Sequence, residues 1–172
     1  MIETKDISNE LLQRKDITDF MYATISANLA PIYGDAWQDN KAMWYQNNII
    51  KSNGTTTVVA FDSGLPCAYF QYSRCEDKTC LWGEMEIDAA YKGDGITFFA
   101  LITHFLRDVN VADCNYVHAH INNRNKHSIN VFMSLGFRAV EFTPSGAKYI
   151  GQRHDVAIWQ KKHHDILNLN LP

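Results

Sequence analysis

The stretch Tyr91-Lys92-Gly93-Asp94-Gly95-Ile96 says most about the fold of this chain. It lies between a run typical of a strand, residues 81–88, and a run typical of a helix, residues 97–109. Two glycines one residue apart allow a tight turn, because neither carries a Cβ atom. The first backbone N–H groups of the next helix have no partner within it, and its dipole is positive at that end. The stretch therefore predicts a phosphate site and a nucleotide-bearing cofactor.

Outward from this turn, the order of predicted elements changes. Before it, the pattern predicts helices over 17–29 and 36–50 and strands over 55–61, 67–73 and 80–88. After it, the pattern predicts a helix over 97–109, strands over 116–121, 137–142 and 155–160, and a helix over 126–135. Hairpins followed by a strand–helix–strand unit predict an α/β fold, with a mixed central β-sheet flanked by helices. We expect one domain over residues 1–172, with a polar C-terminal tail over about 162–172.

Composition excludes several classes of function. The net charge is -3, and no Lys/Arg cluster alternates with aromatic residues, so we expect no nucleic-acid partner. No apolar run approaches the ~18 residues that cross a bilayer, and the polar residues 1–6 lack a signal-peptide core, so we expect a cytoplasmic protein with no membrane contact. The four cysteines suit reduced thiols, and none has metal-ligand spacing to another ligand, so we expect no metal.

Two motifs together resemble a known family. The first is the strand, the turn Lys92-Gly93-Asp94-Gly95-Ile96-Thr97 and the apolar helix after it. The second is Asn125 followed by Ser128-Ile129, Val131-Phe132 and Leu135-Gly136-Phe137. The pair resembles the acyl-CoA-binding core of the GNAT superfamily of N-acetyltransferases, over about residues 80–140. The resemblance implies that acetyl-CoA is the co-substrate and that its acetyl group passes to a primary amine.

The resemblance also implies which residues contact the cofactor. The pyrophosphate would lie on the backbone of the turn, and the thioester along the end of the preceding strand. Asn125 would contact the amide arm, and Phe132 stands where many relatives carry a tyrosine that protonates the thiolate. Lys92 replaces an arginine or glutamine of the family pattern, and Thr97 replaces a glycine or alanine. The cofactor-binding set is Ile87, Asp88, Lys92, Gly93, Asp94, Gly95, Ile96, Thr97, Asn125, Ser128 and Phe132.

Other nucleotide motifs fit less well. A dinucleotide fingerprint requires a third glycine at position 98, which is Phe98, and an acidic residue after the next strand, where Asn122 stands. A Walker loop requires a Gly-Lys-Ser/Thr ending, which the sequence lacks. We reject both.

A general base is needed because an amine of pKa ~10.4 is almost entirely protonated at pH 7. Strand alternation places Trp82, Glu84, Glu86 and Asp88 on one face. Glu86 and Glu84 are candidate bases, although such a face can also be a solvated one. His120, on the strand 116–121, occupies the position at which some relatives carry a glutamate base, and an imidazole suits proton removal near neutral pH. A strand histidine can equally be a packing or surface residue.

The acceptor is the least defined part of the prediction. Tyr33, Trp37, Trp44 and Tyr45 belong to a segment that covers the substrate cleft in similar proteins, although aromatics at helical spacing also serve as core. The acceptor is a small-molecule or protein amine, and a homodimer is compatible with the resemblance. Phe132 and Thr97 motivate an alternative, a non-catalytic acyl-CoA-binding or regulatory module. A small interaction protein without a cofactor is a third hypothesis.

Overall fold

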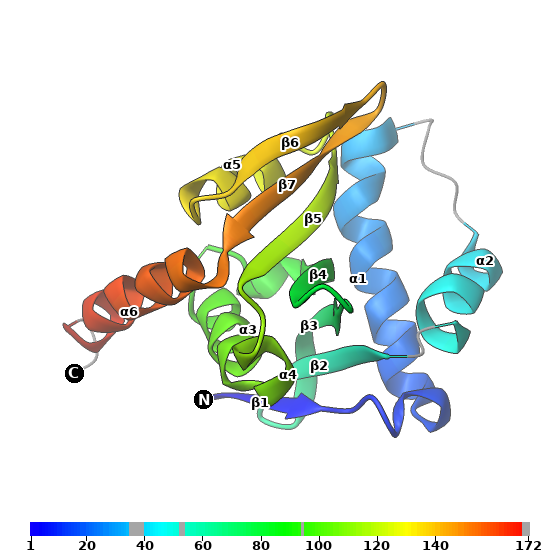
Figure 1. Cartoon of the computed structure of the whole chain (residues 1–172). Coiled ribbons are helices and arrows are strands. Elements are labelled where there is room, and N and C mark those ends of the chain that lie inside the picture. Colours follow the sequence, from blue (N-terminus) through cyan, green and yellow to red (C-terminus); the bar gives the residue numbers. More distant parts are fainter. Residues whose placement is uncertain (35–39, 52–53, 94, 170–172) are drawn as a thin grey trace. The chain divides into compact units, whose positions relative to one another are not determined.

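The structure is a computed structural model that describes residues 1–34, 40–51, 54–93 and 95–169. Seven strands form a mixed sheet in the order β1-β2-β3-β4-β5-β7-β6 (Figure 1). The strands are β1 (Ile2–Asp6), β2 (Thr55–Asp62), β3 (Leu65–Arg74), β4 (Thr79–Ile87), β5 (Tyr116–Asn122), β6 (Arg138–Thr143) and β7 (Gly146–Gln152). The helices are α1 (Lys15–Tyr33), α2 (Lys41–Tyr45), α3 (Ile96–Arg107), α4 (Val109–Ala112), α5 (Lys126–Ser134) and α6 (Arg153–Leu169). The predicted mixed α/β class is confirmed.

The chain divides into two compact units, and β4 and α3 contribute residues to both. The first unit consists of Met1–Tyr72 and Glu84–Leu101. The second consists of Ser73–Gly83 and Ile102–Pro172. A single domain over the whole chain stays a prediction.

The first unit is built around α1. Ile17, Met21 and Ile25 are buried at spacings of four residues, as expected when one helix face meets a core. They pack with Val59 and Tyr69 of β2 and β3. The predicted helix over 17–29 is confirmed and is longer at both ends.

The hairpin of β2 and β3 corresponds to the predicted strands over 55–61 and 67–73. Ser63 and Gly64 form a two-residue loop, both with positive φ (52° and 83°), which fits the right-handed twist of antiparallel neighbours. β1 pairs antiparallel with β2 from Ile2↔Asp62 to Asp6↔Val58, although its polar sequence carries no clear strand signal. Pairing with an existing strand therefore determines β1.

The predicted helix over 36–50 is confirmed from Lys41 onward. The side chain of Asn40 accepts a hydrogen bond from the backbone N–H of Met43, so the helix begins at Lys41. It then continues as a π-type turn over Gln46–Ile50. The predicted cap Asp35 and residues 36–39 lie outside the described residues.

The second unit contains β5, β6 and β7 side by side, with α5 and α6 (Figure 1). β5 runs parallel to β4 and antiparallel to β7, and β6 runs antiparallel to β7. An aromatic cluster fills its core: the Trp82 ring lies 5.6 Å from Phe105 and 4.9 Å from Phe132, and Phe132 lies 4.9 Å from Phe137 (centroid distances). These residues correspond to the apolar positions of the predicted helices and strands.

The predicted last strand over 155–160 is wrong, because these residues belong to α6. Val156 is buried while Ile158 is 49% exposed, although residues two apart in a strand lie on the same face and are expected to be buried alike. The last strand is instead β7, which the sequence pattern does not predict because glycines weaken its strand signal. A Cβ atom at Gly151 would lie 2.5 Å from the Phe137 ring, and one at Gly146 would lie 2.4 Å from the Ile121 carbonyl oxygen. Both glycines are therefore required by close packing.

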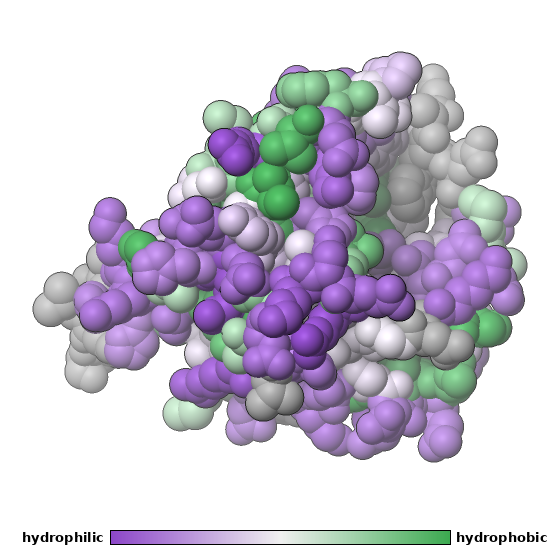
Figure 2. All heavy atoms as spheres, viewed as in Figure 1, coloured by the Kyte–Doolittle hydropathy of each residue, from purple (hydrophilic) through white to green (hydrophobic). Residues whose placement is uncertain are grey.

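Hydrophilic residues cover most of the face shown in Figure 2. Within the part of the chain that the structure describes, no helix combines the length and apolar character needed to cross a membrane. The same residues contain no group of three or more His, Cys, Asp or Glu side chains arranged to hold a metal ion.

Candidate active site

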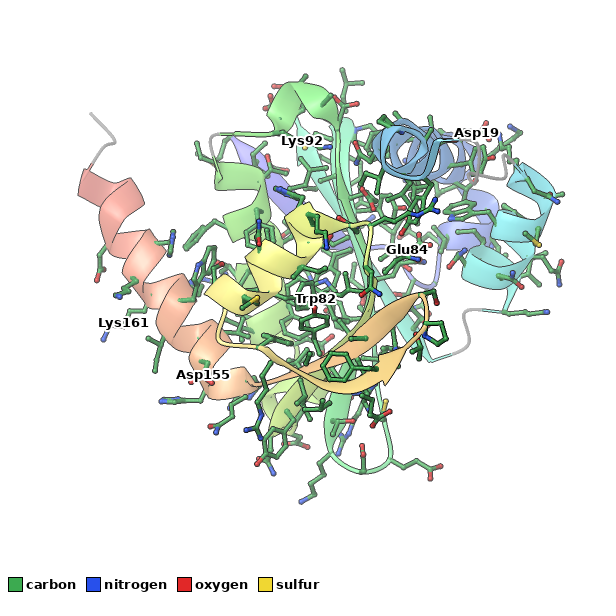
Figure 3. The ribbon with its side chains drawn as sticks, turned by 90° about the horizontal axis from the view of Figure 1, so that it is seen from above. Asp19, Trp82, Glu84, Lys92, Asp155 and Lys161 are labelled. Carbon is green, nitrogen blue, oxygen red and sulfur yellow. The ribbon has the colours of Figure 1, made fainter. Side chains whose placement is uncertain are left out.

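Two glutamates from β4 form the centre of the candidate site in the first unit. Glu84 Oε2 accepts hydrogen bonds from the Tyr69 hydroxyl (3.0 Å) and from the Trp44 indole N–H (3.3 Å). Glu86 Oε2 accepts one from the Asn28 amide (2.6 Å). α1, α2 and β3 thus each contribute one donor to this carboxylate pair. Figure 3 labels Glu84 and, on the loop after β4, Lys92.

Burial changes the acidity of both carboxyl groups. It raises the pKa of Glu86 to about 7, and the nearby charge of Glu84 adds to the rise. The hydrogen bond from Asn28 and the charge of Lys92 oppose it. Burial also raises the pKa of Glu84, against the hydrogen bonds from Tyr69 and Trp44. Both glutamates are half-buried and hydrogen-bonded to α1, α2 and β3, so this face of β4 is not a fully solvated one.

The glycine turn adopts the backbone conformation that its sequence predicts. Gly93 and Gly95 have φ of 109° and 73°, which residues with a Cβ atom rarely adopt. Apart from each glycine and its chain neighbours, no atom of the described residues lies within 4 Å of either Cβ position, so the space above the turn is open in this part of the structure. α3 begins directly after Gly95, at Ile96. Asp94 lies outside the described residues.

Thr97, the unexpected residue of the turn motif, is 1% exposed. Its hydroxyl makes no hydrogen bond to any described residue. A buried hydroxyl without a partner costs roughly 1–3 kcal/mol. The position therefore favours a ligand that would supply a hydrogen-bond acceptor.

The end of β4 is fixed by local hydrogen bonds. The Ile87 carbonyl accepts a bond from Asn28 (3.1 Å), and the Asp88 N–H donates to the Cys67 carbonyl (2.9 Å). The Asp88 carboxylate caps the short turn Ala89–Tyr91 by accepting from the Ala90 N–H (2.9 Å). Cofactor contacts at these two positions stay a prediction.

The predicted cofactor contacts downstream of the turn lie in the second unit. Asn125 caps α5, and its side-chain oxygen accepts from the Ser128 N–H (3.1 Å). Phe132 is 6% exposed within the aromatic core, so packing accounts for it fully. The structure thus gives each of the three a structural role, and their contact with a cofactor stays a prediction.

His120 also lies in the second unit. It is exposed on β5, opposite Lys148 of β7, and its ring makes an edge contact with His118 at 6.0 Å between centroids. Burial lowers the pKa of His118, and the charges of Lys148 and His120 lower it further. His120 as a base stays a prediction.

The sequence predicts no site role for Asn28 or Tyr69, and it assigns Trp44 only to a segment that covers the substrate cleft in similar proteins. Asn28 lies three residues after Ile25 and seven after Met21, so it shares their buried face. A polar side chain on an apolar helix face requires a partner, which was an available signal. Trp37, the other tryptophan of that segment, lies outside the described residues.

Comparison with known proteins identifies the fold. An N-acetyltransferase, paia, from Thermoplasma acidophilum in complex with coenzyme A superposes with a TM-score of 0.69 at 10% identity, over 88% of this chain and 99% of that one. The chain has the GNAT fold. A GNAT-family acetyltransferase from Staphylococcus aureus gives 0.63 at 11% identity, over 89% and 99%. Apo FdhC, a nucleotide-linked sugar GNAT, gives 0.67 at 11%, over 95% and 93%.

Sequence comparison adds nothing to this result. No protein-family model matches the chain, and no curated protein matches it. The GNAT fold is therefore recognised from the arrangement of strands and helices alone. The structural matches confirm the expected mixed sheet flanked by helices.

Proposed function

We propose that the protein is an acyltransferase that moves an acetyl group from acetyl-CoA to a primary amine, with Glu86 as general base. The observation that carries this proposal is the largely buried carboxyl group of Glu86, whose pKa is about 7, on the strand before the glycine turn. A base of this pKa is half ionised at neutral pH, where it can both accept and release a proton.

The raised pKa has a quantifiable advantage. Transfer of a proton from an ammonium group of pKa ~10.4 to a carboxylate of ordinary pKa, ~4.5, is unfavourable by about 8 kcal/mol. Transfer to Glu86, with its pKa of about 7, is unfavourable by about 4.6 kcal/mol. Burial of the carboxyl group therefore removes roughly 3 kcal/mol from the deprotonation step.

The residues of the turn fit the phosphates of coenzyme A. The backbone at Gly93 and Gly95 is open to a close approach, and the dipole of α3 is positive there. The buried Thr97 hydroxyl lacks an acceptor among the described residues, and a phosphate oxygen would provide one. Coenzyme A in the complex of the Thermoplasma acidophilum acetyltransferase supports the assignment by analogy of fold.

Each residue then has a defined role. Glu86 takes the proton of the ammonium group, directly or through one water. Burial keeps the pKa of Glu86 high, and the charge of Glu84, which Tyr69 and Trp44 hold by hydrogen bonds, adds to the rise. When bound, acetyl-CoA would supply the thioester carbonyl, at which the C–N bond would form as the C–S bond breaks. The second proton released from the amine nitrogen would go to the departing thiolate, so that coenzyme A leaves as the thiol. The paired carboxyl groups favour a cationic acceptor.

The test measures release of coenzyme A thiol across a panel of primary amines. We expect turnover with at least one amine, and a loss of about 100-fold or more in kcat for Glu86→Gln. Glu76→Gln, at an exposed position of the second unit, is the matched control and should leave kcat unchanged. An active Glu86→Gln enzyme would remove Glu86 as the base and leave His120 or Glu84.

Binding is measured separately. Acetyl-CoA at 100 times its dissociation constant adds ~2.7 kcal/mol of stability, which raises the melting temperature by roughly 5–10 °C. Gly95→Ala should abolish most of this rise, because alanine is strained at a φ of 73°. Gly64→Ala is the control, because it introduces a similar backbone strain, at a φ of 83°, in the β2–β3 hairpin loop and not in the turn. It should leave the rise in melting temperature with acetyl-CoA unchanged. The absence of a rise in the wild type would refute the proposal.

A non-catalytic acyl-CoA-binding module is the second candidate. It is favoured by Phe132, which replaces a tyrosine of the family pattern and is fully accounted for as core. This candidate predicts the melting rise without thiol release with any amine, so the two measurements together distinguish the functions.

A further inference from the structure

A chain of three side chains connects the glycine turn to the candidate base within the first unit. Lys92 Nζ donates to Asn28 Oδ1 at 2.5 Å, and Asn28 Nδ2 donates to Glu86 Oε2 at 2.6 Å. The family resemblance implies that Lys92 is a cofactor-binding residue. The structure places its ammonium group on the amide that holds Glu86.

Lys92 determines the orientation of this amide. An ammonium group can only donate, so the amide oxygen of Asn28 must face Lys92, and the NH₂ group then faces β4. Its two hydrogens go to Glu86 and to the Ile87 carbonyl (3.1 Å). A flipped amide would direct its oxygen at the carboxylate and lose all three bonds. Lys92 therefore acts on Glu86 through Asn28.

The residue at position 28 suits this role and little else. Asparagine is a poor helix former, and here it lies within the long helix α1. Aspartate of equal size would direct a negative charge at Glu86, and leucine would leave the carboxylate without its donor. The hydrogen bonds explain why an amide is present there.

We propose that Asn28 is a positioning residue, which fixes the carboxylate of Glu86 and joins it through Lys92 to the glycine turn. An anion bound at the turn then changes the hydrogen bonding and the charge around Glu86. Lys92 is exposed and immediately precedes Gly93, so an anion at the turn competes with Asn28 for its ammonium group. Withdrawal of Lys92 frees the amide and removes a positive charge from the surroundings of Glu86. Cofactor loading would then make Glu86 a stronger base.

Two charged groups act on Glu86 besides Asn28. Glu84 on the same strand raises its pKa, and Lys92 lowers it. Tyr69 on β3 faces both glutamates with a pKa far above its ordinary value, so it stays neutral over the relevant range. Removal of Lys92 or of Asn28 therefore raises the pKa of Glu86, because both lower it in the wild type.

The test is an NMR titration of the Glu86 side-chain carboxyl carbon in the unliganded protein. We expect Asn28→Leu to raise the midpoint by about one pH unit, because it removes a hydrogen bond to the charged form. Lys92→Met should raise it by a smaller amount. Lys51→Met, at an exposed position of the same unit, is the matched control and should not change it. Lys92 is exposed, so its variant remains informative if Asn28→Leu does not fold.

The titration is then repeated with inorganic pyrophosphate. We expect pyrophosphate to raise the midpoint in the wild type, and to raise it less in Lys92→Met, where only the direct field of the anion remains. Unchanged midpoints in both variants, or equal pyrophosphate effects in wild type and Lys92→Met, would overturn the inference. It rests on the proposed function only for the role of Glu86 as base. Because the titration needs no turnover, its failure is distinct from an absence of acetyl transfer.

Discussion

Replacement of Glu86 by glutamine should change how the stability of the protein depends on pH. The pKa of Glu86 is raised from 4.5 in the unfolded chain to about 7 in the folded one, mainly by burial. The folded state therefore holds the proton more tightly between these values, and the stabilisation is complete below pH ~4.5. It decreases as the pH rises and is lost above ~7. Since one pK unit corresponds to ~1.36 kcal/mol, the total loss is about 3 kcal/mol.

Glutamine reproduces the shape of the protonated carboxyl group and can still accept the hydrogen bond from Asn28. We therefore expect the wild type to lose about 3 kcal/mol relative to Glu86→Gln between pH 4.5 and 8. The assay is urea unfolding of both proteins at half-unit pH intervals. Other titrating groups are common to both proteins, so they cancel in the difference. Glu76→Gln is the control for a carboxyl group at an exposed position.

A difference that stays constant with pH would refute the reasoning, because it would show that Glu86 titrates alike in the folded and unfolded states. A difference of opposite sign would show a depressed pKa, as in an ordinary salt bridge. Either result would also remove the physical basis for Glu86 as a base near neutral pH.

Three further predictions concern side chains whose roles the structure separates. Phe132→Ala should destabilise the protein by about 3–5 kcal/mol in urea unfolding, because it leaves a cavity against Trp82 and Phe137; a much smaller loss would contradict the core assignment. Tyr69→Phe should raise the titration midpoint of Glu84 in NMR, because the carboxylate loses a donor, and an unchanged midpoint would contradict the 3.0 Å bond. Iodoacetamide labelling of the native protein should modify half-buried Cys75 first, because the other three cysteines are buried: Cys67, Cys80 and Cys114. Labelling of all four at equal rates would contradict this burial.

Much of the fold could be predicted from local pattern. Apolar spacing located α1, α3 and α5, and the predicted strands over 55–61 and 67–73 correspond to β2 and β3. The errors occurred where a tertiary neighbour overrides local preference. β1 exists because β2 offers it an edge, and β7 carries glycines because Phe137 and Ile121 approach too closely for a side chain.

The candidate site divides in the same way. Strand alternation placed Glu84 and Glu86 on one face of β4, and the glycine turn has the positive φ values that its two glycines predict. The acidity of Glu86 could not be predicted, because a pKa depends on burial and on partners distant in the sequence. Asn28 lies 58 residues from Glu86, and Lys92 lies 64 residues from Asn28.

The sequence by itself determined α1 and most of the strands and helices from β2 to β6, the tight turn before α3 and the presence of two carboxylates on one strand. These features depend on side-chain periodicity and on backbone freedom, which act over a few residues. Only the tertiary structure decided that the carboxylates are buried, that Asn28 holds one of them and that Lys92 faces Asn28. Those properties arise when distant segments exclude water together, and no local pattern in the chain encodes that event.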